Sequence, residues 1–354
     1  MSEVRAKKAL GQHFLVDLNI ARKICDALSG GVRPEAGAET RAVAAGSADA
    51  DAETRTRVAG YAGAGAEART MAAGSADAGA EARTKATGTA DAETRRGVAA
   101  SADARLAADT TAAGAPAAAE EERGGAVPCD VLEVGCGMGV LTQFLLRRGD
   151  ITTYGAEIDP ESVEYLHAHF PEFAPRLIEG DFLKMNLRER FPRGLKIIGN
   201  FPYNISSQIF FKVLEHRDLV PECVGMIQKE VAVRIAEPPG SKEYGILSVL
   251  LQAWYDIEYL FTVNETVFNP PPKVKSAVIR LRRNSVGRLG CDEALFVKVV
   301  KASFGQRRKM IRNSLRTVFG DFGGAEHPFF TQRAEQLSVA DFVQLTNWVA
   351  ANRK

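Results

Sequence analysis

Apolar residues along the middle of the chain follow two patterns that alternate. Short apolar runs that end in glycine or polar turn residues predict strands, at residues 131–134, 152–158, 176–179, 196–199 and 224–228. Between them, apolar positions recur every three or four residues and predict helices, at residues 141–148, 160–169, 205–215 and 230–236. Strands that alternate with helices form a mainly parallel sheet with helices on both faces. The pattern therefore predicts an α/β fold.

Further patterns lie on both sides of this region. Residues 18–28 predict a first helix, and residues 257–263 and 277–281 predict two late strands that close one edge of the sheet. Beyond residue 284 the pattern is helical, at residues 294–304, 308–319 and 338–350. We therefore expect four parts: a basic arm with the first helix (1–33), an insertion (34–126), the α/β domain (127–283) and a small helical domain (284–354).

The composition of residues 34–125 differs from that of the other residues: 34 are Ala and 12 are Gly, and Leu106 is the only Ile, Leu, Phe or Trp. Ala-Glu-(Thr or Ala)-Arg begins at Ala38 and recurs with a period of 14 through Ala80. Such repeats have no apolar face on which to stack and bury too little surface to offset their ordering entropy. We expect a repeat expansion without a stable fold in a surface loop; a partner-binding or spacing segment is the alternative. Because it precedes the first strand, we expect it to project away from the carboxyl edge of the sheet, where ligands bind.

Charge and cysteine content narrow the class of protein. The insertion has 15 acids and 10 bases, a net charge of −5, so the other residues carry +6 of the total of +1. No run of about 18 uncharged apolar residues occurs, so we expect no membrane span. Five Cys without a Cys-x-x-Cys pair indicate reduced thiols and a cytoplasmic location. His167 and His169 lie two residues apart on a predicted helix and point to different faces, so we expect no metal site.

Three features predict a nucleotide-like cofactor at the carboxyl edge of the sheet. Gly135, Gly137 and Gly139 form a Gly-x-Gly-x-Gly turn directly after the first strand, which lets the backbone approach a ligand closely. Glu157 ends the second strand and can accept hydrogen bonds from ribose hydroxyls, and Asp181 follows the third strand, where an adenine amino group would lie. NAD would satisfy the turn and Glu157 equally well.

The motif that decides between cofactors is Asn200-Phe201-Pro202-Tyr203, at the end of the fourth strand. The Asn200 side-chain carbonyl and the backbone carbonyl of Phe201 or Pro202 can accept the two protons of an exocyclic amine, while Tyr203 stacks on the ring. Holding both protons aims a weakly nucleophilic adenine N6 and favours the charge that develops on transfer. A sulfonium methyl is already activated, so no Ser, Cys or His nucleophile is required.

In these motifs the chain resembles the KsgA-type (RsmA) small-subunit rRNA adenine N6,N6-dimethyltransferases. The resemblance covers nearly all residues outside 34–125 and rests on the segments 8–15 (KALGQHFL), 133–139 (EVGCGMG), 200–204 (NFPYN), 228–230 (QKE), 244–249 (YGILSV) and 268–274 (FNPPPKV). It implies a class I, Rossmann-like fold that depends on S-adenosyl-L-methionine. It further implies dimethylation of two adjacent adenines in the 3′-terminal hairpin loop of 16S rRNA, within the small ribosomal subunit or its precursor, by a monomer with a role in subunit biogenesis.

The resemblance also implies roles for individual residues. His13 and Leu15 border the methionine part of the cofactor, Gly135 lies in the cofactor turn, and Asn200 lies between the cofactor and the target base. Glu157 takes the ribose and Asp181 the adenine end. His13 stands where many relatives have Asn, a change that keeps a polar side chain.

Phe268 precedes three prolines and has two interpretations. It stacks on the target base opposite Tyr203, which would make a sandwich of a flipped adenine, or it is a core aromatic residue that anchors the proline-rich loop.

Charge predicts an RNA-binding surface independently of the resemblance. Residues 269–320 contain 13 Lys and Arg but two acids. We expect Arg308, Arg312 and Arg316 on one face of a helix whose opposite face is formed by Ile311, Leu315 and Val318. An imbalance of this size favours contact with phosphates over ion pairs within the helix. The candidate RNA contacts are Lys273, Arg307, Arg308, Arg312 and Arg316.

Two other functions stay open at this point. A large-subunit rRNA adenine methyltransferase of the antibiotic-resistance type shares the Asn-x-Pro-Tyr motif; the FNPPPKV segment and residues 306–309 favour the small-subunit group. A non-catalytic ribosome-assembly factor would lack Asn200, Tyr203 or Glu157, all of which are present. An NAD oxidoreductase is the weakest alternative, because no proton-transfer residue stands out beside the glycine turn.

Overall fold

The structure is a computed structural model that describes residues 4, 6–7, 10–30 and 128–353. By contacts the chain divides into two units, residues 1–36 with 123–354 and residues 37–122, and the described residues all belong to the first unit. The predicted insertion, 34–126, lies outside the described residues.

A seven-stranded sheet with the order β4-β3-β2-β5-β6-β9-β7 forms the centre of the fold. Its strands are β2 (Cys129–Val134), β3 (Ile151–Glu157), β4 (Leu177–Glu179), β5 (Lys196–Asn200), β6 (Glu222–Gln228), β7 (Tyr255–Val263) and β9 (Ser276–Arg283). The strands β2 to β6 are parallel, whereas β9 is antiparallel to both β6 and β7. The predicted α/β fold and the two late strands at one edge are therefore confirmed.

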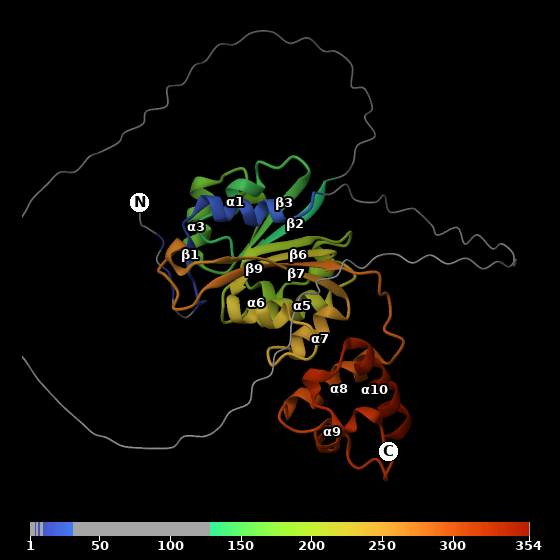
Figure 1. The fold of residues 1–354 in the computed structure, drawn as a ribbon. Coiled ribbons are helices and arrows are strands. Elements are labelled where there is room, and N and C mark those ends of the chain that lie inside the picture. The colour runs from blue at the N-terminus through green and yellow to red at the C-terminus, as the bar shows by residue number, and fades with distance from the viewer. Residues whose placement is uncertain (1–3, 5, 8–9, 31–127, 354) are drawn as a thin grey trace, which may run out of the picture. The chain divides into compact units, whose positions relative to one another are not determined.

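Helices cover both faces of this sheet (Figure 1). They are α1 (Leu18–Ala27), α2 (Thr142–Leu145), α3 (Pro160–His169), α4 (Leu187–Arg190), α5 (Ser206–Glu215), α6 (Lys229–Ala236) and α7 (Ile246–Gln252). The helices α1 and α3 lie on one face, and α5, α6 and α7 lie on the other. Within the described ranges, none of the helices is both long enough and apolar enough to cross a membrane.

The predicted helix 141–148 spans only Thr142–Leu145 in the structure, because the turn that follows is tighter than an α-helix. The Arg148 N–H donates to the Leu145 carbonyl (3.1 Å), a bond between residues three apart that tightens the chain ahead of Gly149. The helix α7 was not predicted, because five consecutive residues, 247–251, are buried and leave no polar face.

Two very short strands join the N-terminal segment to the loop before β9. β1 (Phe14–Leu15) pairs antiparallel with β8 (Phe268–Asn269), with Leu15 opposite Phe268. Strands of two residues carry no periodic pattern, so the sequence did not predict this pairing. It fixes residues 14–15 beside the proline-rich loop.

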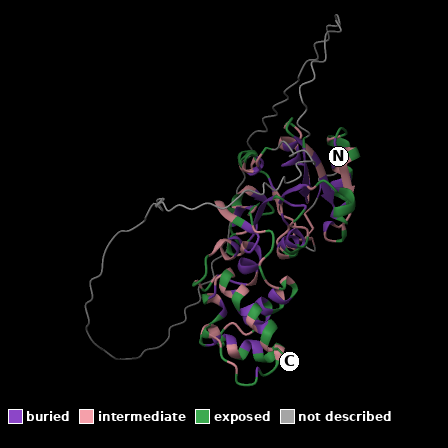
Figure 2. Cartoon of the chain, turned by 90° about the vertical axis from the view of Figure 1, so that its right-hand side faces the viewer, coloured by how far each residue is buried: buried purple, intermediate pink, exposed green. Residues whose placement is uncertain are grey.

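Three helices follow β9: α8 (Glu293–Gly305), α9 (Ile311–Phe319) and α10 (Val339–Asn352). Aromatic rings connect them to the preceding elements, since the centroid of Trp254 lies 6.0 Å from that of Phe296, and the centroid of Tyr244 lies 6.2 Å from that of Phe304. Buried residues continue from the sheet into these helices (Figure 2). The sheet and the helices share one hydrophobic cluster, so the division into two domains at 283/284 stays a prediction.

The described residues on both sides of the insertion lie at the amino edge of the sheet. Lys196 begins β5 and donates to the Ser29 carbonyl (2.8 Å), and Glu222 begins β6 and accepts from the Ser29 N–H (3.2 Å). Arg148 donates to the Leu28 carbonyl (2.9 Å). Since β2 starts at Cys129, the chain leaves and re-enters the described structure at the edge opposite the carboxyl ends of the strands.

Candidate functional site

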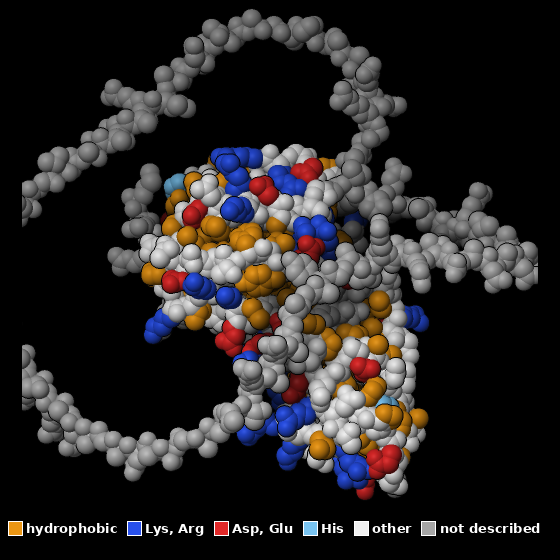
Figure 3. All heavy atoms as spheres, viewed as in Figure 1, with side chains coloured by type: hydrophobic (Ala, Val, Ile, Leu, Met, Phe, Trp, Pro, Cys, Tyr) orange, Lys and Arg blue, Asp and Glu red, His pale blue; other side chains and the backbone are white. Residues whose placement is uncertain are grey.

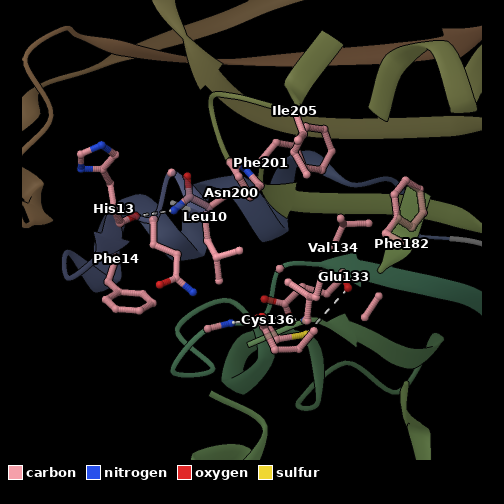
Figure 4. Close-up of a pocket in the computed structure, with 18 of the residues that line it drawn as sticks. Leu10, His13, Phe14, Glu133, Val134, Cys136, Phe182, Asn200, Phe201 and Ile205 are labelled. Carbon is pink, nitrogen blue, oxygen red and sulfur yellow. Dashed lines mark hydrogen bonds between the residues drawn. The ribbon is translucent and has the colours of Figure 1, made fainter. Parts of the chain in front are cut away.

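A pocket opens at the carboxyl edge of the sheet, where the ends of β2, β3, β4 and β5 meet residues 10–15 (Figure 4). Most of the predicted catalytic and cofactor residues line it, namely His13, Leu15, Gly135, Gly137, Glu157, Asp181, Asn200, Pro202 and Tyr203. The structure brings these residues together from parts of the chain that are up to 190 positions apart (Tyr203 minus His13). Their individual roles stay predictions.

The glycine turn has a backbone that favours glycine. Gly135 has a φ of 76° and Gly137 a φ of 53°, both in the left-handed region. A Cβ on Gly137 would lie 3.1 Å from Cε1 of Phe14, and one on Gly135 would lie 3.8 Å from Cδ of Pro202. The turn therefore packs its backbone directly against the N-terminal segment and the Asn-Phe-Pro-Tyr turn.

Glu157 is a buried carboxylate that is held by backbone amides. Its Oε2 accepts from the Gly137 N–H (2.8 Å), and its Oε1 accepts from the N–H groups of Ile158 and Asp159 (2.9 Å each). Burial raises the pKa of Glu157 above its ordinary value, although these hydrogen bonds act in the opposite direction. The bonds orient the carboxylate, and Oε2, which accepts only one of them, keeps a further lone pair for a ligand hydroxyl.

Asp181 lies beyond the end of β4 and caps the short helical turn that follows. Its Oδ1 accepts from the Leu183 N–H (2.9 Å), so the side chain is fixed at the rim of the pocket. Leu15 is 2 % exposed and belongs to the core below the pocket.

Glu133 is a site residue whose role the sequence did not suggest. It lines the pocket from β2, is 1 % exposed, and accepts a hydrogen bond from Oγ1 of Thr142 (2.6 Å). Burial raises the pKa of Glu133 to about 8. The signal that could have found it is an acid inside the predicted strand 131–134, whose other residues are apolar.

We expect Glu133→Gln to change the pH dependence of stability. The folded state keeps the Glu133 proton up to about pH 8, whereas the unfolded state releases it near the ordinary value of 4.5. Stability that Glu133 contributes is therefore fully present below the unfolded pKa and is lost as pH rises through the folded pKa. Between about pH 5 and about pH 8, the free energy of unfolding should fall less for the variant than for the wild type, as measured by denaturant unfolding. Equal losses in both proteins would contradict the burial argument.

The Asn200 side chain is oriented by the N-terminal segment. Its Nδ2 donates to the His13 backbone carbonyl (2.9 Å), which leaves Oδ1 as the acceptor atom (Figure 4). The Phe201 N–H donates to the Met226 carbonyl (3.0 Å), and the Pro202 carbonyl accepts from the Ile205 N–H (3.2 Å). Because the Pro202 carbonyl already has a partner, the Phe201 carbonyl is the better candidate for a second acceptor beside Asn200 Oδ1.

Tyr203 lies next to His13 at the mouth of the pocket. The two ring centroids are 5.3 Å apart and the ring planes are inclined by 31°. The Tyr203 hydroxyl forms a hydrogen bond with the Ser276 hydroxyl, and His13 Nδ1 lies 2.9 Å from the Pro270 carbonyl oxygen. Both rings are thus fixed by contacts with the segment around β8 and β9.

Phe201, the residue between Asn200 and Pro202, anchors the turn. The side chain is 1 % exposed and lies over Gly199 of β5 and Gly225 of β6, where a Cβ on either glycine would overlap its ring. The turn is therefore held to the sheet by a ring that fits only while both neighbours lack side chains.

We expect Gly225→Ala to displace the Phe201 ring and, with it, the turn that carries Asn200. Turnover should fall by roughly tenfold or more, because small misplacements of reacting groups have large effects on rate. Gly287→Ala is the matched control, since a Cβ there would meet no atom within 4 Å. Methyl-transfer assays on both variants test this; equal rates would show that the ring does not position the turn.

Phe268 is not where the sandwich hypothesis requires it. The side chain is 4 % exposed and packs in the core with Leu15, Val263 and Val278, and it is not among the described residues that line the pocket. A ring buried on both faces cannot stack on a base. The prediction that Phe268 contacts the target adenine is therefore wrong for this conformation, and the alternative, a core aromatic residue that anchors the proline-rich loop, holds.

The helix expected at 308–319 begins at Ile311. Residues 306–308 form a turn, and Met310 forms an isolated bridge with Arg333, so Arg308 precedes the helix and is exposed. Ile311 and Leu315 are buried as predicted, but Val318 is 58 % exposed and does not belong to the apolar face.

Three of the candidate RNA-binding arginines have partners within the protein. Arg307 donates to the Tyr244 carbonyl (3.0 Å) and to the Lys242 carbonyl. Arg312 forms an ion pair with Glu326, and Arg316 with Asp321 (3.0 Å). These acids lie in the loop after α9, and basic and acidic side chains occur next to one another on the C-terminal helices (Figure 3). Arg312 and Arg316 therefore pair with acids outside their helix, whereas Lys273 and Arg308 are exposed; the phosphate contacts of all these residues stay predictions.

Comparisons with known proteins agree with this geometry. A family model described as ribosomal RNA adenine dimethylase matches residues 128–351. The chain is 61% identical over 218 residues to the ribosomal RNA small subunit methyltransferase A of Parabacteroides distasonis, which covers 61% of this chain and 81% of that protein. It is 57% identical over 221 residues to the protein of the same name from Cytophaga hutchinsonii, with 62% and 86% covered. Among solved structures, a dimethyladenosine transferase from Plasmodium falciparum matches with a TM-score of 0.52 and 26% identity, over 63% of this chain and 90% of that chain.

Proposed function

The chain belongs to the ribosomal RNA adenine dimethylase family and is an S-adenosylmethionine-dependent rRNA adenine dimethyltransferase, and from this premise we propose that it dimethylates N6 of two adjacent adenines in the 3′-terminal hairpin loop of 16S rRNA. Relatives named for the small subunit, at 57% to 61% identity, support this substrate over large-subunit rRNA. The observation that carries the proposal is the fixed Asn200 amide, whose Nδ2 is bound to His13 so that Oδ1 accepts.

The pocket fits S-adenosylmethionine in its donor set. Two left-handed glycines expose the backbone of the turn, a buried carboxylate at the end of β3 can accept a hydrogen bond from a ribose hydroxyl, and Asp181 lies beyond β4 for the adenine end. We assign these contacts to Gly135 and Gly137, Glu157 and Asp181, with His13 and Leu15 beside the methionine part. When bound, this cofactor supplies a methyl group that is already activated by its sulfonium centre.

The residues of the turn act on the adenine amine. Asn200 Oδ1 and the Phe201 carbonyl accept its two protons, which directs the N6 lone pair at the methyl carbon and stabilises the positive charge that develops there. When bound, the cofactor would supply the methyl group to the nitrogen that these two acceptors hold, and the amine would then release one proton to water. For the second transfer one proton remains, and one acceptor suffices. Pro202 fixes the turn, and Tyr203 stacks on the base.

RNA binding involves fewer of the predicted arginines than the charge count suggested. We assign phosphate contacts to the exposed Lys273 and Arg308. We also assign them to Arg312 and Arg316, which would exchange their ion pairs with Glu326 and Asp321 for a phosphate. Arg307 supports the surface by fixing residues 242–244. The protein acts as a monomer in the cytoplasm, on the small subunit or its precursor, and thereby contributes to subunit biogenesis.

Incubation with labelled S-adenosylmethionine and unmethylated small subunits tests the proposed substrate. Mass mapping should find dimethyladenosine at two adjacent positions near the 3′ end of 16S rRNA. Label in large-subunit rRNA would support the antibiotic-resistance type instead. Binding to small subunits without any transfer would support a non-catalytic assembly factor.

Deletion of residues 36–124 should leave methyl transfer unchanged. The described flanks, at Ser29 and Cys129, lie at the amino edge of the sheet, opposite the pocket. Rates measured on small subunits for the full chain and for the deletion variant test this expectation. A deletion variant that folds but no longer methylates would show that the insertion contributes to the site or to RNA docking.

A further inference from the structure

The N-terminal segment reaches the catalytic amide through a chain of polar contacts that begins at Asp159. Asp159 follows β3 by two residues and its side chain is fully buried. Its Oδ2 accepts from Nε2 of Gln12 (3.1 Å), and its Oδ1 accepts from Nζ of Lys7. Gln12 is held at its other end as well, because its Oε1 accepts from the Lys7 N–H (2.7 Å). Both ends of the Gln12 amide are therefore fixed.

Gln12 precedes the residue that orients Asn200. The His13 carbonyl accepts from Asn200 Nδ2 (2.9 Å), so the position of this carbonyl determines where Asn200 Oδ1 lies. On the other side, the Asp159 N–H donates to Oε1 of Glu157 (2.9 Å). One continuous set of contacts thus joins the ribose-binding acid to the catalytic amide.

We infer that Gln12 and Asp159 are positioning residues, which hold the His13 carbonyl where it orients Asn200 toward the target amine. This inference rests on the proposed function, because it assigns the pair to the same methyl-transfer site. Neither residue touches the reacting atoms; both act through the backbone of His13.

Asp159 does more than cap a helix. As the N-cap of α3 it accepts from the Glu161 N–H (3.4 Å) and from the Ser162 hydroxyl (3.2 Å). A serine could perform that function equally well. Burial acts to raise the pKa of Asp159, but the hydrogen bonds from Lys7 and Gln12 outweigh it and hold the pKa below its ordinary value. The carboxylate is therefore ionised and available to both N-terminal partners.

Two variants separate positioning from capping. Asp159→Ser keeps the cap and removes the contacts with Gln12 and Lys7. Gln12→Ala removes the contact between Gln12 and Asp159 and leaves the cap unchanged. Each should lower the single-turnover rate of methyl transfer by roughly tenfold to a hundredfold, and the double variant should be no slower than either single variant. Gln344→Ala, an exposed glutamine on α10, is the control and should leave the rate unchanged.

The deciding measurement is the effect of Gln12→Ala on the methyl-transfer rate in wild type and in an Asn200→Ala background. Cofactor affinity is measured alongside by calorimetry. If Gln12 acts through Asn200, Gln12→Ala slows wild type but has no further effect when Asn200 is absent. An equal slowing in both backgrounds, or a loss explained entirely by weaker cofactor binding, would overturn the inference. An Asn200→Ala variant that retains full activity would overturn the role assigned to Asn200. Wild-type protein that transfers no methyl group to small subunits would instead overturn the proposed function itself.

Discussion

Asn200→Ala should lower the rate of methyl transfer by roughly a hundredfold to a thousandfold, the effect of removing one preorganised polar contact from a transition state. The structure orients the Asn200 amide in the pocket, since the His13 carbonyl binds its Nδ2 and leaves Oδ1 to accept. Without Oδ1, the adenine amine keeps one acceptor, the Phe201 carbonyl, and is no longer aimed. Single-turnover transfer to small subunits with labelled cofactor measures the loss.

The fold should survive this substitution, because Asn200 ends β5 and is only partly buried. Asn347→Ala, at an exposed position of α10, serves as the control and should keep full activity. An Asn200→Ala variant that methylates at the wild-type rate would show that another group holds the amine.

Phe268→Ala should lower the free energy of unfolding by about 3–5 kcal/mol, as truncation of a buried Phe does. The ring is 4 % exposed and packs with Leu15 and Val263 beneath the β1–β8 pair. Loss of the ring leaves a cavity at the point where the N-terminal segment joins the proline-rich loop. Denaturant unfolding measures the change in free energy.

Phe211→Ala is the matched control, because this phenylalanine of α5 is 38 % exposed and should lose far less stability. The outcome separates the two interpretations that the sequence left open. If Phe268→Ala keeps its stability and cofactor affinity but no longer methylates, the ring contacts the target base after all, and it must leave the core to do so.

The fold could be predicted wherever one periodicity dominates. The strands β2 to β6 and the helix α3 lie within one or two residues of their predicted positions, because each strand is a short, mainly apolar or β-branched run between turn residues. The helix α7 has no polar face, and the strands β1 and β8 have two residues each, so no periodic pattern identified them. Tertiary contacts, not local propensity, determine these elements.

The site was predictable in its members but not in its contacts. Strand ends marked Glu157, Asp181 and Asn200, because parallel strands bring their carboxyl ends to one edge. The sequence marks Glu133 only as an acid within an apolar strand and could not show that it lies buried in the same pocket. Charge counting could not identify the partners of Arg312 and Arg316, because Glu326 and Asp321 follow them in a loop and not on the same helix.

A crystal structure with bound S-adenosylhomocysteine tests the central claim most directly. The account predicts the ligand in the pocket at the carboxyl edge, in contact with Gly135 and Glu157. It also predicts that Asn200 Nδ2 still binds the His13 carbonyl and that Oδ1 faces the position of the transferable methyl group. A ligand bound elsewhere, or an Asn200 side chain turned away from the sulfur atom, would contradict it.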